Sequence, residues 1–312
     1  MAFKNIKNTK LKLIMFFIIC FFLLASAVNA EDYKVIFNHL DGVGDDYGPG
    51  DYYYPQNHIF KNRSNLFDLK SLTIFENEEE YKYRFSFSNL TDPWGAKYGF
   101  SLPLIEVYID NQAGGSNKLF HSGANISFEE DFHWNKFLKI SGWWVKLFNP
   151  DSRKENILDI NDLSLREPNS SENINLSRKD NYIFLRISKS EINLVQNSKI
   201  VVLIGSFDPF GYDHFRSLSN NKSYWQIYSE TNISDSKNPR VLDILVPGGK
   251  SQKEILSGEL PKIPYLEIDF EKKAGDSTLV DYLMPVNKVS LSILLFYIII
   301  LILTIFKFKY KK

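Results

Sequence analysis

The chain of 312 residues has almost no cysteine. Its one cysteine, Cys20, lies in an apolar N-terminal run, so the rest of the chain has neither a disulfide nor a catalytic thiol. There is also no excess of one charge, because lysine plus arginine and aspartate plus glutamate each number 37. Without a basic excess, the sequence argues against nucleic acid as a partner.

The common catalytic motifs are missing as well. No Gly-x-Ser-x-Gly nucleophile motif occurs. Paired carboxylates of a glycoside hydrolase meet only in space, so the sequence leaves that alternative open. We nevertheless expect a protein that is not an enzyme. The histidines have no HxxxH or HExxH spacing, which argues against a zinc hydrolase: His39, His58, His121, His133 and His214.

Long apolar runs occur only at the two ends. Residues 13–24 are apolar, follow four lysines in residues 1–12, and precede a stretch of small residues. This pattern predicts a signal peptide over residues 1–30 that is cleaved before Glu31, since the run is short for a membrane span. An uncleaved anchor is the alternative.

The C-terminal run is longer and predicts a different fate. Residues 289–306 carry no charge, with Lys288 before them and four lysines in residues 307–312 after them. We expect a transmembrane helix over residues 288–306 and a cytoplasmic basic tail over residues 307–312, because the denser basic end stays inside. The protein is then a single-pass protein of the cell membrane with the bulk of the chain extracellular.

An acidic, glycine-rich stretch is the strongest candidate for a metal site. Residues 41–51 contain four aspartates and four glycines, and three tyrosines follow directly. Carboxylates this close repel one another unless a cation lies between them, and oxygen ligands on a bent loop suit calcium. A solvated acidic turn is the alternative, and for Asp208 an Asx-turn before Pro209. The expected ligands are Asp41, Asp45, Asp46, Asp51 and Asp208, with Asp213 as a further carboxylate in the same turn as Asp208.

Three separated motifs carry a family resemblance. They read DGVGDDYGPGDYYYP at residues 41–55, NLTDPWGAKYGFS at 89–101 and FDPFGYDHFR at 207–216. In this order they resemble the glucodextranase C-terminal-like domain family, a β-sandwich related to family 9 carbohydrate-binding modules and to DOMON-like domains. The resemblance implies a secreted, non-catalytic β-sandwich in which calcium plays a structural part. A haem-binding relative would need axial methionine or histidine ligands. Met284 is the only methionine of the exported part and lies close to the expected membrane helix, which argues against a Met/His pair.

The residue pattern independently favours strands. Residues 81–88 alternate aromatic and polar side chains and predict a half-buried antiparallel strand that pairs with 66–75. We expect an all-β, antiparallel β-sandwich over residues 31–247, with a loop at 149–177, one helical turn at 190–196 and a polar stalk at 248–287 in which 260–270 packs as a late strand. Further strands are expected at 33–40, 104–110, 137–140, 143–148, 182–187, 199–205, 224–228 and 241–246.

Sugar binding by such modules depends on exposed aromatic faces, and the candidates are Trp134, Trp144, Trp225 and Tyr53. Burial in the core is the alternative for each of them. The expected function is a membrane-anchored extracellular module that binds a polysaccharide or surface glycan. The alternative is a structural, S-layer-associated protein that binds other envelope proteins without sugar specificity. Seven Asn-x-Ser/Thr sequons also make a glycoprotein plausible.

Overall fold

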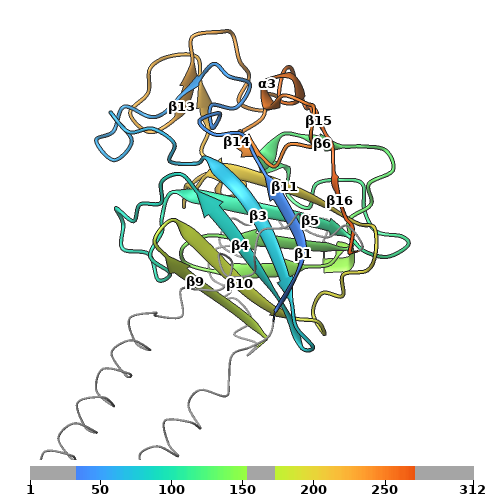
Figure 1. Ribbon diagram of the computed structural model, residues 1–312. Helices are drawn as coiled ribbons and strands as arrows, with labels where there is room; N and C mark the ends of the chain where they lie inside the picture. Colours follow the sequence, from blue (N-terminus) through green and yellow to red (C-terminus); the bar gives the residue numbers. More distant parts are fainter. Residues whose placement is uncertain (1–32, 153–172, 271–312) are drawn as a thin grey trace, which may run out of the picture. The chain divides into compact units, whose positions relative to one another are not determined.

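The computed structural model describes residues 33–152 and 173–270. Five strands form one sheet in the order β1-β3-β4-β10-β9, and every neighbouring pair is antiparallel (Figure 1). The half-buried strand expected at 81–88 is confirmed, because β4 buries its aromatic side chains while Lys82 and Arg84 on the other face stay partly exposed. The strands are β1 (Lys34–Leu40), β3 (Leu69–Glu76), β4 (Glu80–Phe87), β9 (Ile174–Lys179) and β10 (Tyr182–Ser188).

A six-stranded antiparallel sheet packs against it. Its order is β14-β11-β5-β7-β8, and β16 also pairs with β11. The core between the sheets contains side chains from both, such as Phe85 from β4 and Val107 from β5. The antiparallel β-sandwich is therefore confirmed. The strands are β5 (Pro103–Asp110), β7 (Lys136–Ile140), β8 (Val145–Phe148), β11 (Ser198–Ser206), β14 (Val241–Ile244) and β16 (Leu266–Ile268).

The outer face of the six-stranded sheet is buried by a second core. Tyr108 and Leu203 point to this side and pack with Phe128, Trp134 and Leu256 from the covering segments. With both faces covered, strands of this sheet have near-continuous apolar sequences instead of an alternating pattern. The covering segments include β6 (Ser127–Phe128), β15 (Lys262–Ile263), the 3-10 turns η1 (Ser122–Ala124) and η3 (Tyr212–His214), and α3 (Gln252–Ile255).

Two small sheets lie outside the sandwich. β12 (Leu218–Ser219), β13 (Ile227–Ser229) and β2 (Tyr52–Tyr53) form one, and β15 pairs with β6 in the other. A third 3-10 turn, η2, covers Pro150–Ser152. Figure 1 shows β13 and α3 at the same end of the sandwich.

Three expectations need correction. The loop expected at 149–177 contains part of a strand, because β9 pairs with β10 along its whole length. Residues 190–196 form turns without a helix. The stalk expected from residue 248 does not begin there, since α3, β15 and β16 belong to the folded unit, which extends to Phe270. Part of the late strand expected in 260–270 is present as β16.

The two expected membrane-related segments, 1–30 and 288–306, lie outside the described residues. Within residues 33–152 and 173–270, no helix is both long and apolar enough to span a membrane.

Candidate functional site

The acidic loop after β1 is folded against β14 and α3. Gly44, Gly48 and Gly50 adopt positive φ angles, which explains why the loop needs glycine there. The Gly48 amide donates to the Leu242 carbonyl of β14 at 2.9 Å. Gln252 of α3 donates its side-chain amide to the Asp45 carbonyl and accepts from the Ile244 amide at 2.9 Å. The loop backbone is thus held on two sides, by the backbone of β14 and by the Gln252 side chain of α3.

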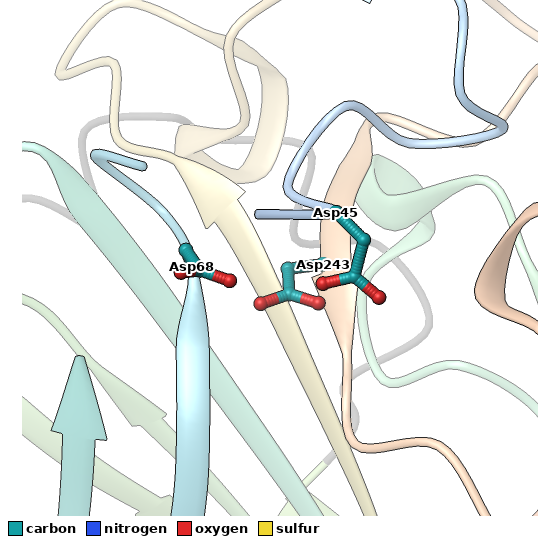
Figure 2. A group of neighbouring side chains, drawn as sticks. All are labelled: Asp45, Asp68 and Asp243. Carbon is teal, nitrogen blue, oxygen red and sulfur yellow. The ribbon is translucent and has the colours of Figure 1, made fainter. Parts of the chain in front are cut away.

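Carboxylates from three segments meet beneath this loop. Asp45 comes from the loop, Asp68 immediately precedes β3, and Asp243 lies within β14. One oxygen of each lies within 4.8 Å of the others, and Figure 2 shows the three side chains converging. Asp68 and Asp243 are 0% exposed, whereas Asp45 is half-buried. Asp41 and Asp46 of the same loop lie close to this group, because their charges contribute to raising the pKa of Asp243.

Hydrogen bonds satisfy only part of this group. Asp68 Oδ1 accepts from the Gly44 amide at 2.8 Å, and Asp243 Oδ2 accepts from the Leu69 amide at 2.6 Å. Asp46 Oδ2 accepts from the Phe67 amide at 2.8 Å and from the Tyr54 hydroxyl. Asp243 Oδ1 also accepts, from the Ile244 amide at 2.8 Å. One buried oxygen on each of the other carboxylates lacks a hydrogen-bond partner: Asp41 Oδ2, Asp45 Oδ1, Asp46 Oδ1 and Asp68 Oδ2.

The electrostatics of the group are unfavourable without a cation. Burial raises the pKa of Asp41 to about 7 and of Asp46 to about 6, with neighbouring carboxylates adding to the effect. Burial also raises the pKa of Asp45, and that of Asp243 lies well above its ordinary value. Unpaired oxygens on converging carboxylates match the oxygen-rich shell of calcium. The donor set therefore fits a hard divalent cation.

The structure divides the predicted metal ligands into two groups. Asp41, Asp45 and Asp46 lie together, whereas Asp51 accepts from Ser229 Oγ at 2.8 Å and from Thr231 Oγ1 at 2.7 Å. Asp208 and Asp213 are also used elsewhere. Asp208 forms an ion pair with Arg216 at 3.3 Å and accepts from the Phe210 amide, as in the Asx-turn alternative. Asp213 Oδ2 accepts from the Gly123 amide at 2.9 Å.

Sequence reasoning missed Asp68 and Asp243. A signal for Asp243 was present, because it is the one charged residue in the apolar stretch Val241–Ile244 of β14. A carboxylate inside a buried strand calls for a partner. Asp68 stands between Phe67 and Leu69 with no comparable signal.

Two of the four aromatic candidates for sugar binding are core residues, which corrects that expectation. Trp134 is 0% exposed and donates its Nε1–H to the Lys118 carbonyl at 2.7 Å. Trp144 is buried against Phe207 and His214. Neither indole has a free face on which a sugar ring can stack.

Tyr53 and Trp225 are instead exposed, at 46% and 44%, and Tyr224 is 58% exposed. The segments that carry them run side by side, because β2 pairs with β13 and the Asn57 amide donates to the Tyr224 carbonyl at 3.1 Å. We call Tyr53, Tyr224 and Trp225 the aromatic platform.

Buried residues hold the aromatic platform in place. The Tyr53 ring stacks on Tyr228 with centroids 5.1 Å apart, and Tyr228 accepts from Gln56 Nε2 at 3.0 Å. The buried Arg216 donates to the Trp225 carbonyl at 2.9 Å, and its guanidinium lies 5.6 Å from the Trp225 ring centroid. Exposed rings on a rigid support lose little side-chain entropy when a ligand packs on them.

A known protein family matches a large part of the chain. The family model of the C-terminal binding module, SLH-like, of glucodextranase matches residues 36–263. The match includes the acidic loop, Asp68, Asp243 and the aromatic platform. No curated protein matches the chain.

Proposed function

This chain belongs to the family of the SLH-like C-terminal binding module of glucodextranase, and we propose that it is a non-catalytic module that binds polysaccharide. The family is described as a binding module, which supports a binding role at a coarse level. The chemistry of the described residues supports the finer assignment to a glycan.

The observation that carries the proposal is the aromatic platform. Three exposed aromatic side chains lie on two adjacent segments, and the Tyr224 and Trp225 rings meet edge to face. The C–H face of a pyranose ring packs on an exposed aromatic ring. An exposed ring of this surface can therefore take a unit of a neutral glycan.

Calcium at the acidic group is the second part of the proposal. Asp45, Asp68 and Asp243 would hold the ion, with Asp41 and Asp46 adjacent. It would neutralise carboxylates from the loop, from the start of β3 and from β14, and so stabilise their contact. Its proposed role is structural, because it would tie the loop to the two strands.

Display at the cell surface is the third part. The proposal rests on the predicted signal peptide, 1–30, and the predicted membrane helix, 288–306. A module displayed in this way would hold the cell, or a partner protein, against a glycan-rich envelope.

A glycan-binding experiment on the purified full-length chain tests the platform. We expect a soluble glucan from a panel of neutral polysaccharides to bind, measured by isothermal titration calorimetry. Tyr53→Ala and Trp225→Ala should each weaken binding at least tenfold. The matched control is Tyr182→Ala, an aromatic residue of similar exposure (38%) on β10. Equal loss in the control, or no loss in the platform variants, would contradict the proposal.

Thermal unfolding in calcium and in chelator tests the metal. A ligand that binds only the folded state adds about 2.7 kcal/mol at a hundredfold excess over Kd. The calcium-dependent rise in Tm should disappear in Asp45→Asn and Asp68→Asn. It should persist in Asp208→Asn, because Asp208 is engaged by Arg216. No rise in the unmodified chain would rule the site out.

A second candidate function is a structural envelope protein that binds other proteins. The SLH-like description of the family favours it. The glycan experiment separates the two, since a calcium-stabilised chain that binds no glycan would favour the structural role.

A further inference from the structure

A cleft opens between the acidic loop and the segment that contains α3. It has a volume of about 400 Å³ and is lined on one side by Asp41, Asp45 and Gly48, and on the other by Lys250, Ser251 and Lys253. This volume lies within the range of small-molecule sites, which is about 300–1,000 Å³. The aromatic platform contributes no side chain to the lining, so the cleft is a separate feature.

The cleft and the acidic group share residues. Asp41 and Asp45 line the cleft and also belong to the group of converging carboxylates, whereas Asp68 and Asp243 are fully buried. Asp46 Oδ1 and Asp68 Oδ2, on residues that are 0% exposed, lack a hydrogen-bond partner. These buried, unpartnered oxygens are an observation independent of the cluster's acidity. They point to a cation at the cleft's acidic side.

The opposite side of the cleft is basic. Lys250 and Lys253 are exposed, and neither takes part in an ion pair among the described residues. The Lys253 side chain lies over the loop, with its Cδ 3.3 Å from where a Cβ on Gly50 would lie. Gln252 lies between these lysines in the sequence. It fixes the distance between their segment and the acidic loop by donating to the Asp45 carbonyl. The two ammonium groups on this side can pair with an anionic group, and a bound cation would offset part of the charge of the carboxylates opposite.

We infer that this cleft binds a carboxylate-bearing saccharide, such as a uronic acid unit, with Lys250 and Lys253 pairing to its carboxylate. The inference rests on the metal site proposed above and deepens it by naming the ligand class. Ordinary phosphate or sulfate is a poorer match, because the lining also includes Tyr47, Ser251 and the loop backbone, which suit the ring and the hydroxyls of a sugar. Neutral glycan at the platform and acidic glycan at the cleft would then be two separate binding events.

The test is calorimetric titration of the full-length chain with digalacturonate and with its methyl ester, in calcium and in chelator. We expect digalacturonate to bind in calcium, at least tenfold more tightly than the ester, and to lose binding in chelator. The double variant Lys250→Gln/Lys253→Gln should weaken binding at least tenfold while leaving the calcium-dependent Tm unchanged. The matched control is Lys118→Gln/Lys179→Gln, which removes the same charge from exposed sites on other segments.

Each contrary result has a distinct meaning. Equal affinity for acid and ester, or no effect of the lysine double variant, would overturn the inference. Loss of digalacturonate binding in Trp225→Ala would overturn it too, because the ligand would then lie on the platform. If calcium still raises the Tm and a neutral glucan still binds, the proposed function stands without this inference. If calcium has no effect, the metal site and the inference fail together.

Discussion

At the residue scale, Gly142 is needed because two segments of the chain approach each other closely at this position. Gly142, just before Trp143 and Trp144, faces the backbone of Phe100, and an added Cβ would lie 1.4 Å from the Phe100 carbonyl oxygen. A backbone atom cannot rotate away as a side chain can, so the only response is to separate the segments. Phe100 lies in the motif at residues 89–101, and Gly142 lies in the turn between β7 and β8.

We therefore expect Gly142→Ala to lower the free energy of unfolding by about 3 kcal/mol, the upper part of the range for overpacking. Urea denaturation of the full-length chain measures it. Gly248→Ala is the matched control, because nothing lies within 4 Å of its added Cβ. Superimposable denaturation curves for the two variants would contradict the explanation.

The burial of His214 predicts that the stability of the protein depends on pH. This residue is buried, has a positive φ of 65°, and both of its ring nitrogens lack a hydrogen-bond partner. Burial, with Lys139 and Lys146 nearby, lowers its pKa from 6.5 to about 4. Between these values the unfolded chain binds a proton that the folded chain does not, so stability falls as the pH drops through this window.

His214→Asn should reduce that loss, because asparagine tolerates the left-handed backbone and does not titrate. The measurement is the difference in urea midpoint between pH 7 and pH 5, compared between the variant and the unmodified chain. His58→Asn, which changes an exposed histidine, serves as the control. An unchanged difference in His214→Asn would show that other groups cause the acid sensitivity.

At the element scale, strands β5 and β7 hold a buried ion pair in the second core. Lys139 Nζ lies 2.7 Å from Glu106 Oε1, and both side chains are about 1% exposed. Lys139 also donates to the Asp213 carbonyl at 2.7 Å, and Tyr108 donates to Glu106 Oε2 at 3.1 Å. The pair therefore connects two strands of the sheet to the η3 turn that covers them.

Removing one partner of this ion pair should lower the free energy of unfolding more than neutralising both partners. Lys139→Met leaves Glu106 buried without its cation and should destabilise the protein by about 3–5 kcal/mol. The double variant Glu106→Gln/Lys139→Met keeps an acceptor for Tyr108 and should recover part of that loss. Chemical denaturation of both single variants and the double variant completes the cycle. A double variant no more stable than Lys139→Met would contradict this account.

The same scale shows what the sequence predicts well. The alternation in residues 81–88 is visible because one face of β4 is buried and the other is not. β9 was missed because its few apolar residues, Ile174 and Leu176, stand among polar ones in an edge strand with a single neighbour. The acidic group was found only in part, since Asp68 and Asp243 approach Asp45 through strand packing, which no spacing in the chain records.

At the scale of the whole molecule, the C-terminal part of the folded unit determines how much of the chain is needed for a stable fold. Residues 248–270 read as a polar stalk, yet they contribute α3, β15 and β16. Leu256 and Ile263 are 0% and 1% exposed in the second core. Gln252 holds the acidic loop. This segment has few apolar residues, but those residues are buried in the second core and hold the segment in place.

A chain that ends at Phe270 should therefore unfold cooperatively and keep its calcium-dependent Tm. A chain that ends at Val246 should lose both, because the outer face of the six-stranded sheet would be exposed and the acidic loop released. Differential scanning calorimetry of the two chains measures this. A cooperative, calcium-sensitive transition in the shorter chain would restore the stalk interpretation.

The position of β16 has a mechanical consequence. A pull on the chain beyond Phe270 would load β16 first, and β16 is attached to β11 by three residue pairs. Gln196 adds two contacts there, to Asp269 and to the Phe270 amide, at 2.7 and 2.8 Å. β15 would be loaded next and α3 only after that, so the acidic loop is the last of these parts to feel tension. Under such a force β16 would detach from β11 first, while the acidic loop and the aromatic platform kept their shape.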